Sequence, residues 1–362
     1  MSKQLSLDLV MQSRAVARAA LGAAGAQQET LEAGSRSLAL AARRAAARDK
    51  AEEAPILELA PTATPAAVNA ARTRRAVRRG RDVYLPSWSD IAVGLPNALL
   101  RSGLWTAGES SDVWMEGAEI ATLGQDTRIL YTGRQLTQYD RRVFAACLDY
   151  YKEDRPLSAG GSSAWVCVSF FQFAQAMGLS YTLNTHKALR ASLVRLEAAA
   201  LRVGTGTLEL PVPRLLEVAF DDGYHTLPES ELKGSDQIAF RVLEQFAALY
   251  GPSTWTAVPK PALELRGIRA WLAGFYATHR IPRELPLSKL QALSGMVCRP
   301  SDFRGCVLRA LDDLSKPDTE DAIRVASYTL SPDRKAITVR MARWQAPGAV
   351  IEADAEVVEE GV

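Results

Sequence analysis

The segment WVCVSFFQFAQAMGLSYTLNTHKALRASLVRLEAAALRVGTGTLEL, residues 165–210, carries the strongest structural signals in this chain. Its first four residues are aromatic or largely β-branched, which predicts a short strand. Ser169 follows where its hydroxyl can cap a helix, and Gly178 can end that helix in a left-handed conformation. A further helix with its own start signal is predicted from Thr182 to about Ala200. The segment therefore predicts a strand followed by two helices.

A hairpin is predicted directly after these helices, because residues 201–203 and 208–210 flank a Gly-Thr-Gly tip at 204–206. An amphipathic helix is predicted upstream, since apolar residues between Thr132 and Tyr151 fall on one face of a 3.6-residue period. Three helices followed by a hairpin have the order of a winged helix, a variant of the helix-turn-helix. Its third helix suits the major groove of DNA.

A looser copy of this order follows in the second half of the chain. The expected elements are a helix at 265–279, an edge strand at 285–287, a helix at 288–294 closed by Gly295, a helix capped by Ser301, and a hairpin at 322–341 with a turn at 331–333. Two such units on neighbouring major grooves would add their phosphate contacts to one another.

We therefore predict an α+β chain of two tandem winged-helix domains, preceded by a largely disordered basic N-terminal region. The low aromatic content and the abundance of Ala, Arg and Glu before about residue 80 indicate disorder there. The predicted divisions are a peptide at 1–10, an Ala/Arg-rich linker at 11–83, a first winged-helix domain at 84–232, a second at 233–344, and an acidic disordered tail at 345–362.

The formal net charge of +2 hides an uneven charge distribution along the 362 residues. Six arginines lie within residues 72–81, whereas the end after Ile351 is acidic. The basic run is either an arm that binds phosphate groups without sequence preference or a solvated linker with incidental charge.

The sequence lacks the residues that several classes of enzyme require. It has no phosphate-binding G-x-x-x-x-G-K-[ST] loop, and His186, His225 and His279 are too far apart for the His cluster of a relaxase. The four cysteines have no C-x-x-C spacing, which favours buried thiols over metal ligands or disulfides. No secretory signal or run of eighteen apolar residues occurs. We expect a cytoplasmic protein that is not an enzyme, needs no cofactor or metal, and does not contact a membrane.

Side chains on the outward face of each third helix are the candidate DNA-binding residues. The candidates are Asn184, Lys187 and Arg190 in the first domain, and Arg299, Ser301, Arg304 and Arg309 in the second. Asn and Arg near the start of such a helix can pair with adenine and guanine edges, whereas Lys more often binds phosphate. The alternative is that both faces are ordinary solvated surfaces. His186, at the edge of the core face, is expected to be structural.

The N-terminal peptide QLSLDL, residues 4–9, places a glutamine and spaced leucines in a polar, flexible end. It resembles the short peptides that bacterial polymerases and their accessory proteins insert into a cleft of the sliding clamp. In those peptides a glutamine forms hydrogen bonds and leucines fill an apolar pocket. The candidate clamp-binding residues are Gln4, Leu5, Leu7 and Leu9.

Three segments resemble the TrfA-type replication initiators of broad-host-range plasmids. LPNALLRSGLW, residues 95–105, is similar to that family's P-N-x-x-x-R-S-x-L-[FW] segment. ILYTGRQL, residues 129–136, is similar to its I-x-Y-T-G-x-x-L stretch and is followed by Asp140 and Val143 in the same spacing. SFFQFAQAMG, residues 169–178, resembles the start of its first helix-turn-helix.

The resemblance implies binding to repeated origin sites, called iterons, and opening of an adjacent A·T-rich segment, including contact with its single strands. It also implies recruitment of the host origin initiator, the replicative helicase and the sliding clamp, and a homodimer in equilibrium with a monomer. The family's clamp peptide is Q-L-S-L-F. Here Asp8 replaces the aromatic residue, and Leu9 takes a hydrophobic place one position later. We expect clamp binding, and the sequence leaves its strength open.

Two other functions remain open from the sequence. A transcriptional regulator with tandem winged helices would bind DNA without a replication role. A partition or scaffold protein would assemble through its N-terminal arm without specific DNA binding.

Overall fold

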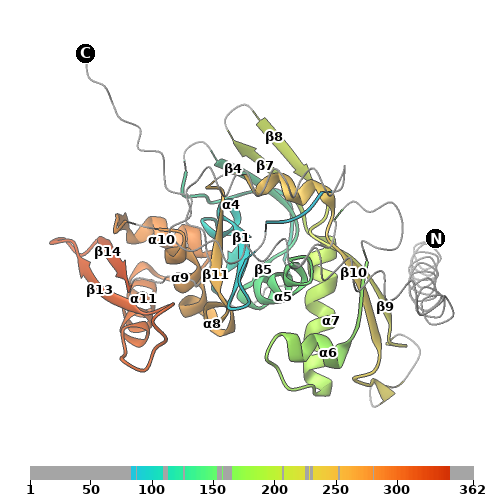
Figure 1. The fold of residues 1–362 in the computed structure, drawn as a ribbon. Helices are drawn as coiled ribbons and strands as arrows, with labels where there is room; N and C mark the ends of the chain where they lie inside the picture. The colour runs from blue at the N-terminus through green and yellow to red at the C-terminus, as the bar shows by residue number, and fades with distance from the viewer. Residues whose placement is uncertain are drawn as a thin grey trace, which may run out of the picture.

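The computed structural model of the chain describes residues 83–342, except residues 87, 109–112, 125–126, 153–156, 158–164, 206–207, 225–227, 229–230, 252 and 280. Helices and strands alternate throughout this region, so the predicted α+β class is confirmed (Figure 1). The predicted clamp peptide, the acidic tail and all but one residue of the predicted linker lie outside the described residues.

A central helix, α5 (Gln138–Asp149), begins at a capping box. The Thr137 hydroxyl accepts from the backbone N–H of Asp140, and the Asp140 carboxylate accepts from the backbone N–H of Thr137 at 2.8 Å. The prediction that this helix begins near Thr132 is wrong. Residues before Gln138 belong to strands β4 (Thr127–Arg134) and β5 (Leu136–Thr137), because the capping box fixes the first helical turn.

The strand and two helices expected after α5 are confirmed as β6 (Val166–Ser169), α6 (Phe170–Ala176) and α7 (Leu183–Ala198). Ser169 caps α6 in a capping box with Gln172, and Gly178 has φ +67° just after that helix. Thr182 caps α7 by accepting from the backbone N–H of Thr185 at 3.1 Å.

The hairpin expected after α7 forms, but it belongs to a different sheet from β6. Its strands β7 (Ala200–Thr205) and β8 (Leu208–Val212) extend an antiparallel sheet in the order β3-β4-β7-β8, in which β3 is Trp114–Ile120. The register pairs Tyr131 of β4 with Leu201 of β7, and these two strands are the inner strands of the sheet.

Strand β6 instead pairs with a later hairpin, in the order β6-β10-β9. The two strands of this hairpin are β9 (Glu217–Asp221) and β10 (Gln237–Arg241). The domain boundary predicted between residues 232 and 233 falls in the connection between these two hydrogen-bonded strands.

Short elements from both halves of the chain complete the first hydrophobic core. They are β1 (Ala92–Pro96), α4 (Asn97–Leu100), β2 (Trp105–Thr106), the 3-10 helix η3 (Glu244–Leu249), β11 (Trp255–Pro259) and α8 (Lys260–Glu264). β1 pairs with β11 and β2 pairs in parallel with β5. Phe246 and Val258 are fully buried in the same cluster as Phe144 of α5.

The second half of the chain forms its own core and sheet. Its elements are α9 (Gly267–Ala277), β12 (Glu284–Pro286), α10 (Leu287–Ser294), α11 (Pro300–Leu314), β13 (Val325–Leu330) and β14 (Ala336–Met341), and the sheet order is β12-β14-β13. The expected hairpin and the Gly295 helix end are confirmed. Ser301 does not cap α11. Arg299 occupies that position and Pro300 begins the helix, where the missing N–H of proline costs nothing.

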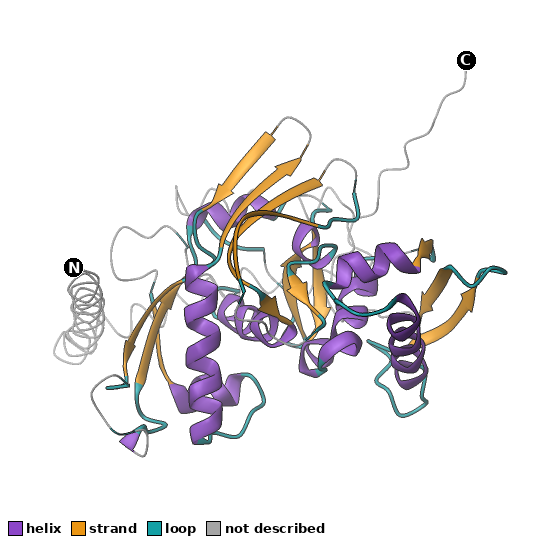
Figure 2. Cartoon of the chain, turned by 180° about the vertical axis from the view of Figure 1, so that it is seen from behind, coloured by secondary structure: helices purple, strands orange, loops and turns teal. Residues whose placement is uncertain are grey.

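Buried and partly buried polar contacts join the two halves. The Arg141 side chain of α5 is buried and donates through Nη2 to the carbonyl oxygen of Ala270 at 2.8 Å, and burial lowers the pKa of this guanidinium to about 9. Arg101 donates to the hydroxyl of Thr278 at 2.8 Å. The hairpins β9–β10 and β13–β14 lie at opposite edges of the molecule, with α5 between them (Figures 1 and 2).

Candidate nucleic-acid interface

The outward face of α7 forms one side of a surface groove of about 260 Å³. Leu189, Leu193 and Leu196 are buried on the opposite face, which fixes how the helix is turned. The groove is lined by Arg134, Lys187, Arg190, Ala191, Val194, Arg195, Ala198 and Tyr224. Four of these side chains are cationic, and none of them is acidic.

Two of the predicted residues, Lys187 and Arg190, line this groove, and Asn184 is exposed one turn before Lys187. Arg134, Arg195 and Tyr224 were missed by the sequence analysis. Arg195 could have been found, since it lies two helical turns after Lys187. Arg134 and Tyr224 come from β4 and from the residues after β9, and no local pattern indicates that they meet α7.

Arg190 is held firmly at the edge of the groove. Its Nε donates to the Asp222 carboxylate at 2.8 Å, and its guanidinium carbon lies 4.5 Å from the ring centre of Phe220 and 4.2 Å from that of Tyr224. Only 14% of the Arg190 side chain is exposed. Burial opposes ionisation of Asp222, but His186 and Arg190 beside it keep the pKa of its carboxyl below the usual value.

His186 lies behind Arg190 in the core. Its ring stacks on Phe170 with 3.6 Å between ring centres, and its Nδ1 lies 3.1 Å from the Tyr181 hydroxyl. Its Nε2 lies 3.7 Å from the Asp222 carboxylate. Because the side chain is fully buried, it supports the end of β9 and does not reach the groove.

Arg195 is positioned by the capping box of α5. Its Nη2 donates to the Oδ1 atom of Asp140 at 2.7 Å, and the same oxygen accepts from the Ser192 hydroxyl at 2.6 Å. Asp140 is fully buried, so the carboxylate that starts α5 also ties α5 to α7. The two arginines at the sides of the groove are thus each anchored by a buried carboxylate.

The predicted residues of the second half are all exposed on or beside α11: Arg299, Ser301, Arg304 and Arg309. The Ser301 hydroxyl lies 3.3 Å from the Asp302 carboxylate, and Arg309 Nε lies 3.3 Å from the Gly305 carbonyl oxygen. These side chains do not meet those of the α7 groove. They share only their exposure along α11 or, for Arg299, at the position just before it.

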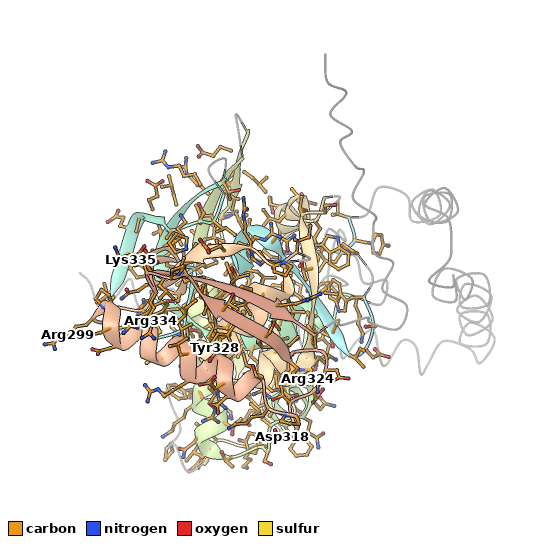
Figure 3. The ribbon with its side chains drawn as sticks, turned by 90° about the vertical axis from the view of Figure 1, so that its left-hand side faces the viewer. Arg299, Asp318, Arg324, Tyr328, Arg334 and Lys335 are labelled. Carbon is orange, nitrogen blue, oxygen red and sulfur yellow. The ribbon has the colours of Figure 1, made fainter. Side chains whose placement is uncertain are left out.

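The sequence analysis predicted a turn at 331–333 but did not include the basic residues beside it, between β13 and β14, among the candidate DNA-binding residues. Arg334, with φ +57°, and Lys335 are exposed there. Figure 3 shows Arg299, Arg334 and Lys335 toward one end of α11, and Asp318 and Arg324 toward the other. Asp312 accepts a hydrogen bond from the Tyr328 hydroxyl, and Asp313 pairs with Lys316, so these two acids lie toward the far end of α11, whereas Asp302 lies in its first turn.

The part of the chain that the structure describes contains no group of three or more His, Cys, Asp or Glu side chains able to hold a metal ion. Its four cysteines form no disulfide. None of its helices is long and apolar enough to cross a membrane.

No protein-family model matches the chain, and no curated protein matches it. Two similar solved structures are both of RctB. One, of selenomethionine derivatives of its domains 2 and 3, has 12% sequence identity and a TM-score of 0.45, over 68% of this chain and 98% of that one. The other, also of domains 2–3, has 12% identity and a TM-score of 0.41, over 67% and 95%. Neither likeness is close enough to define the architecture or function of this chain.

Proposed function

We propose that this chain is a replication initiator that binds duplex DNA, with α7 and α11 each lying in a major groove. The α7 groove carries the proposal, because four cations surround the exposed face of one helix. A helix about 10–12 Å across matches a major groove about 12 Å wide, and cations along its sides can contact the phosphates. Asn184 and Arg190 are the proposed base-edge contacts in this half, and Lys187 is a proposed phosphate contact.

Matching sheet orders support a winged-helix architecture for both halves. β6 lies between α5 and α6 and borders the hairpin β9–β10, as β12 lies between α9 and α10 and borders β13–β14. In each sheet the single strand pairs with the second strand of its hairpin. We therefore assign β9–β10 and β13–β14 as the wings and place the domain boundary near Arg266.

The second wing adds proposed phosphate contacts to those of α11. Arg334 and Lys335 lie in its turn, toward the same end of α11 as Arg299, the residue just before that helix. In this domain Arg304 and Arg309 are the proposed contacts along the helix, and Ser301 is a proposed contact in its first turn.

The initiation role rests on the sequence resemblance of residues 95–212 to TrfA-type initiators. On that basis we propose binding to iterons, opening of A·T-rich origin DNA, and recruitment of the host initiator, helicase and sliding clamp. Self-association is also proposed, through the surface around Trp114, which is 55% exposed on the edge strand β3.

The test has two stages. Full-length protein is first titrated against direct repeats from the DNA flanking its gene, with scrambled duplex as control and at several salt concentrations. Specific binding with a steep salt dependence is expected. A plasmid whose only origin is that repeat region should then replicate when the protein is supplied separately. Binding without replication would indicate a transcriptional regulator, and no repeat binding would overturn the proposal.

A further inference from the structure

The side of the groove that α7 forms is apolar along its middle, with cationic side chains at both edges. Ala191, Val194 and Ala198 line it, and their spacing of three and four residues places them in one stripe along the helix. Val194 is 42% exposed and is not part of the hydrophobic core of this domain. A single exposed valine is common on protein surfaces, so its setting decides whether it has a role.

Ion-paired arginines flank Val194. Arg190 and Arg195 lie on either side of the stripe, and the buried carboxylates of Asp222 and Asp140 hold them in place. Lys187 continues the stripe toward the start of the helix. A ligand that fits this surface can place an apolar group on the stripe and negative charge near the cations beside it, of which Arg190 and Arg195 are already paired with carboxylates.

The major groove of duplex DNA has this arrangement where thymine occurs. Phosphates follow both edges of the groove, and thymine alone among the four bases carries a C5-methyl group on its floor. Small apolar side chains make favourable contacts with this methyl group, whereas they discriminate poorly among hydrogen-bonding base edges.

We propose that α7 reads thymine through its C5-methyl groups, with Val194 as the specificity-determining contact and Ala191 and Ala198 leaving room for the bases. This inference rests on the proposed DNA binding and specifies what the helix recognises. Val194 adds base preference, while the cations around it add affinity that does not depend on sequence.

The experiment uses full-length protein and a duplex pool with 20 randomised base pairs, amplified with dTTP or with dUTP, which lacks only the C5-methyl group. Selection from the dTTP pool should enrich sequences with thymine at fixed positions. In a selected duplex, replacing those thymines singly by deoxyuridine should weaken binding at one or more positions by about fourfold, the factor expected for one buried methyl group.

Protein variants assign the effect to Val194. Val194→Ser should bind thymine and deoxyuridine duplexes equally, whereas Val194→Ile should keep the preference for thymine. Ile91→Ser changes a similarly exposed apolar residue outside the groove; it is the matched control and should behave as wild type. A duplex with a 5-methylcytosine·guanine pair at a sensitive position should bind the protein more tightly than a duplex with a cytosine·guanine pair there.

Each outcome is decisive. Equal wild-type affinity for thymine and deoxyuridine duplexes, with specific enrichment retained, would overturn this inference and leave the proposed DNA binding intact. An unchanged thymine preference in Val194→Ser would also overturn it. No enrichment of any sequence would overturn the DNA-binding proposal itself, and this inference with it.

Discussion

Arg190 of α7 and Asp222 at the end of β9 form a largely buried ion pair with 2.8 Å between Nε and Oδ2. The pair joins the proposed recognition helix to the start of the loop between β9 and β10. Phe220 and Tyr224 on the same segment contact the guanidinium with their rings. The helix and the hairpin beside it are therefore expected to present one surface of fixed shape.

Replacing Arg190 with alanine should lower specific repeat affinity by about 1–3 kcal/mol, as expected for loss of a guanine-edge contact. The measurement is a titration against the repeat and against variants at each guanine. Arg202→Ala removes an exposed arginine of β7 outside the groove and should have no effect. Unchanged affinity and base preference in Arg190→Ala would remove its assignment as a base contact. An equal loss in Asp222→Asn would indicate that Arg190 acts by holding the β9–β10 loop.

Glycines at two helix positions should respond to alanine with opposite signs. A methyl group at Gly274 would overlap Nη1 of the buried Arg141, so Gly274→Ala should destabilise the fold by about 1–3 kcal/mol. Gly305 of α11 has open space around it, so Gly305→Ala should stabilise by about 0.5–1 kcal/mol. Denaturant unfolding of both variants measures these changes in the free energy of unfolding. An unchanged free energy in Gly274→Ala would show that the Arg141 side chain moves aside at no cost.

His279 should make stability depend on pH. Burial, and to a lesser extent Arg101 and Arg283, lower the pKa of this histidine to about 4 from an ordinary value near 6.5. The unfolded chain then binds more protons between these values, so stability should be full above pH 6.5 and fall as pH drops toward 4, by roughly 3 kcal/mol at most. His279→Gln should flatten the dependence of the unfolding free energy on pH between about 4 and 6.5. If the unfolding free energy changes with pH equally in wild type and His279→Gln, the prediction is wrong.

The second domain should protect only one end of each repeat. Arg304→Ala combined with Arg309→Ala should shorten the nuclease footprint at that end, because α11 and α7 are separate helices on either side of α5. Arg324→Ala, at the other end of α11 from Arg299, is the control and should leave the footprint complete. Loss of protection along the whole repeat would mean that these arginines support the fold or self-association.

The N-terminal peptide should bind the sliding clamp independently of DNA. A labelled peptide of residues 1–14 should bind with micromolar affinity in fluorescence anisotropy, and Leu7→Ala with Leu9→Ala should abolish binding. Each leucine is expected to contribute roughly 1.5–3 kcal/mol when fully buried. The same double variant of the full chain should bind repeats as wild type does. Equal clamp binding by both peptides would leave residues 4–9 without this role.

Sequence signals that act within a few residues predicted several elements correctly. The Ser169 cap, Gly178 and the apolar positions of α7 placed two helices, because caps and amphipathic faces depend on neighbouring residues. Two local signals were overlooked. Thr137 with Asp140 begins α5 in a capping box, and Pro300 begins α11, so the predicted starts at Thr132 and Ser301 were wrong.

Tertiary structure alone determined which strands meet and which charges pair. β6 pairs with β10, about seventy residues later, although a hairpin at 200–212 is nearer in sequence. The periodicity of a strand indicates which face is buried but not which strand lies beside it. For the same reason the sequence placed Arg190 on the outward face of α7 but did not show Asp222 beside it. A long-range ion pair forms only where packing brings two distant segments together.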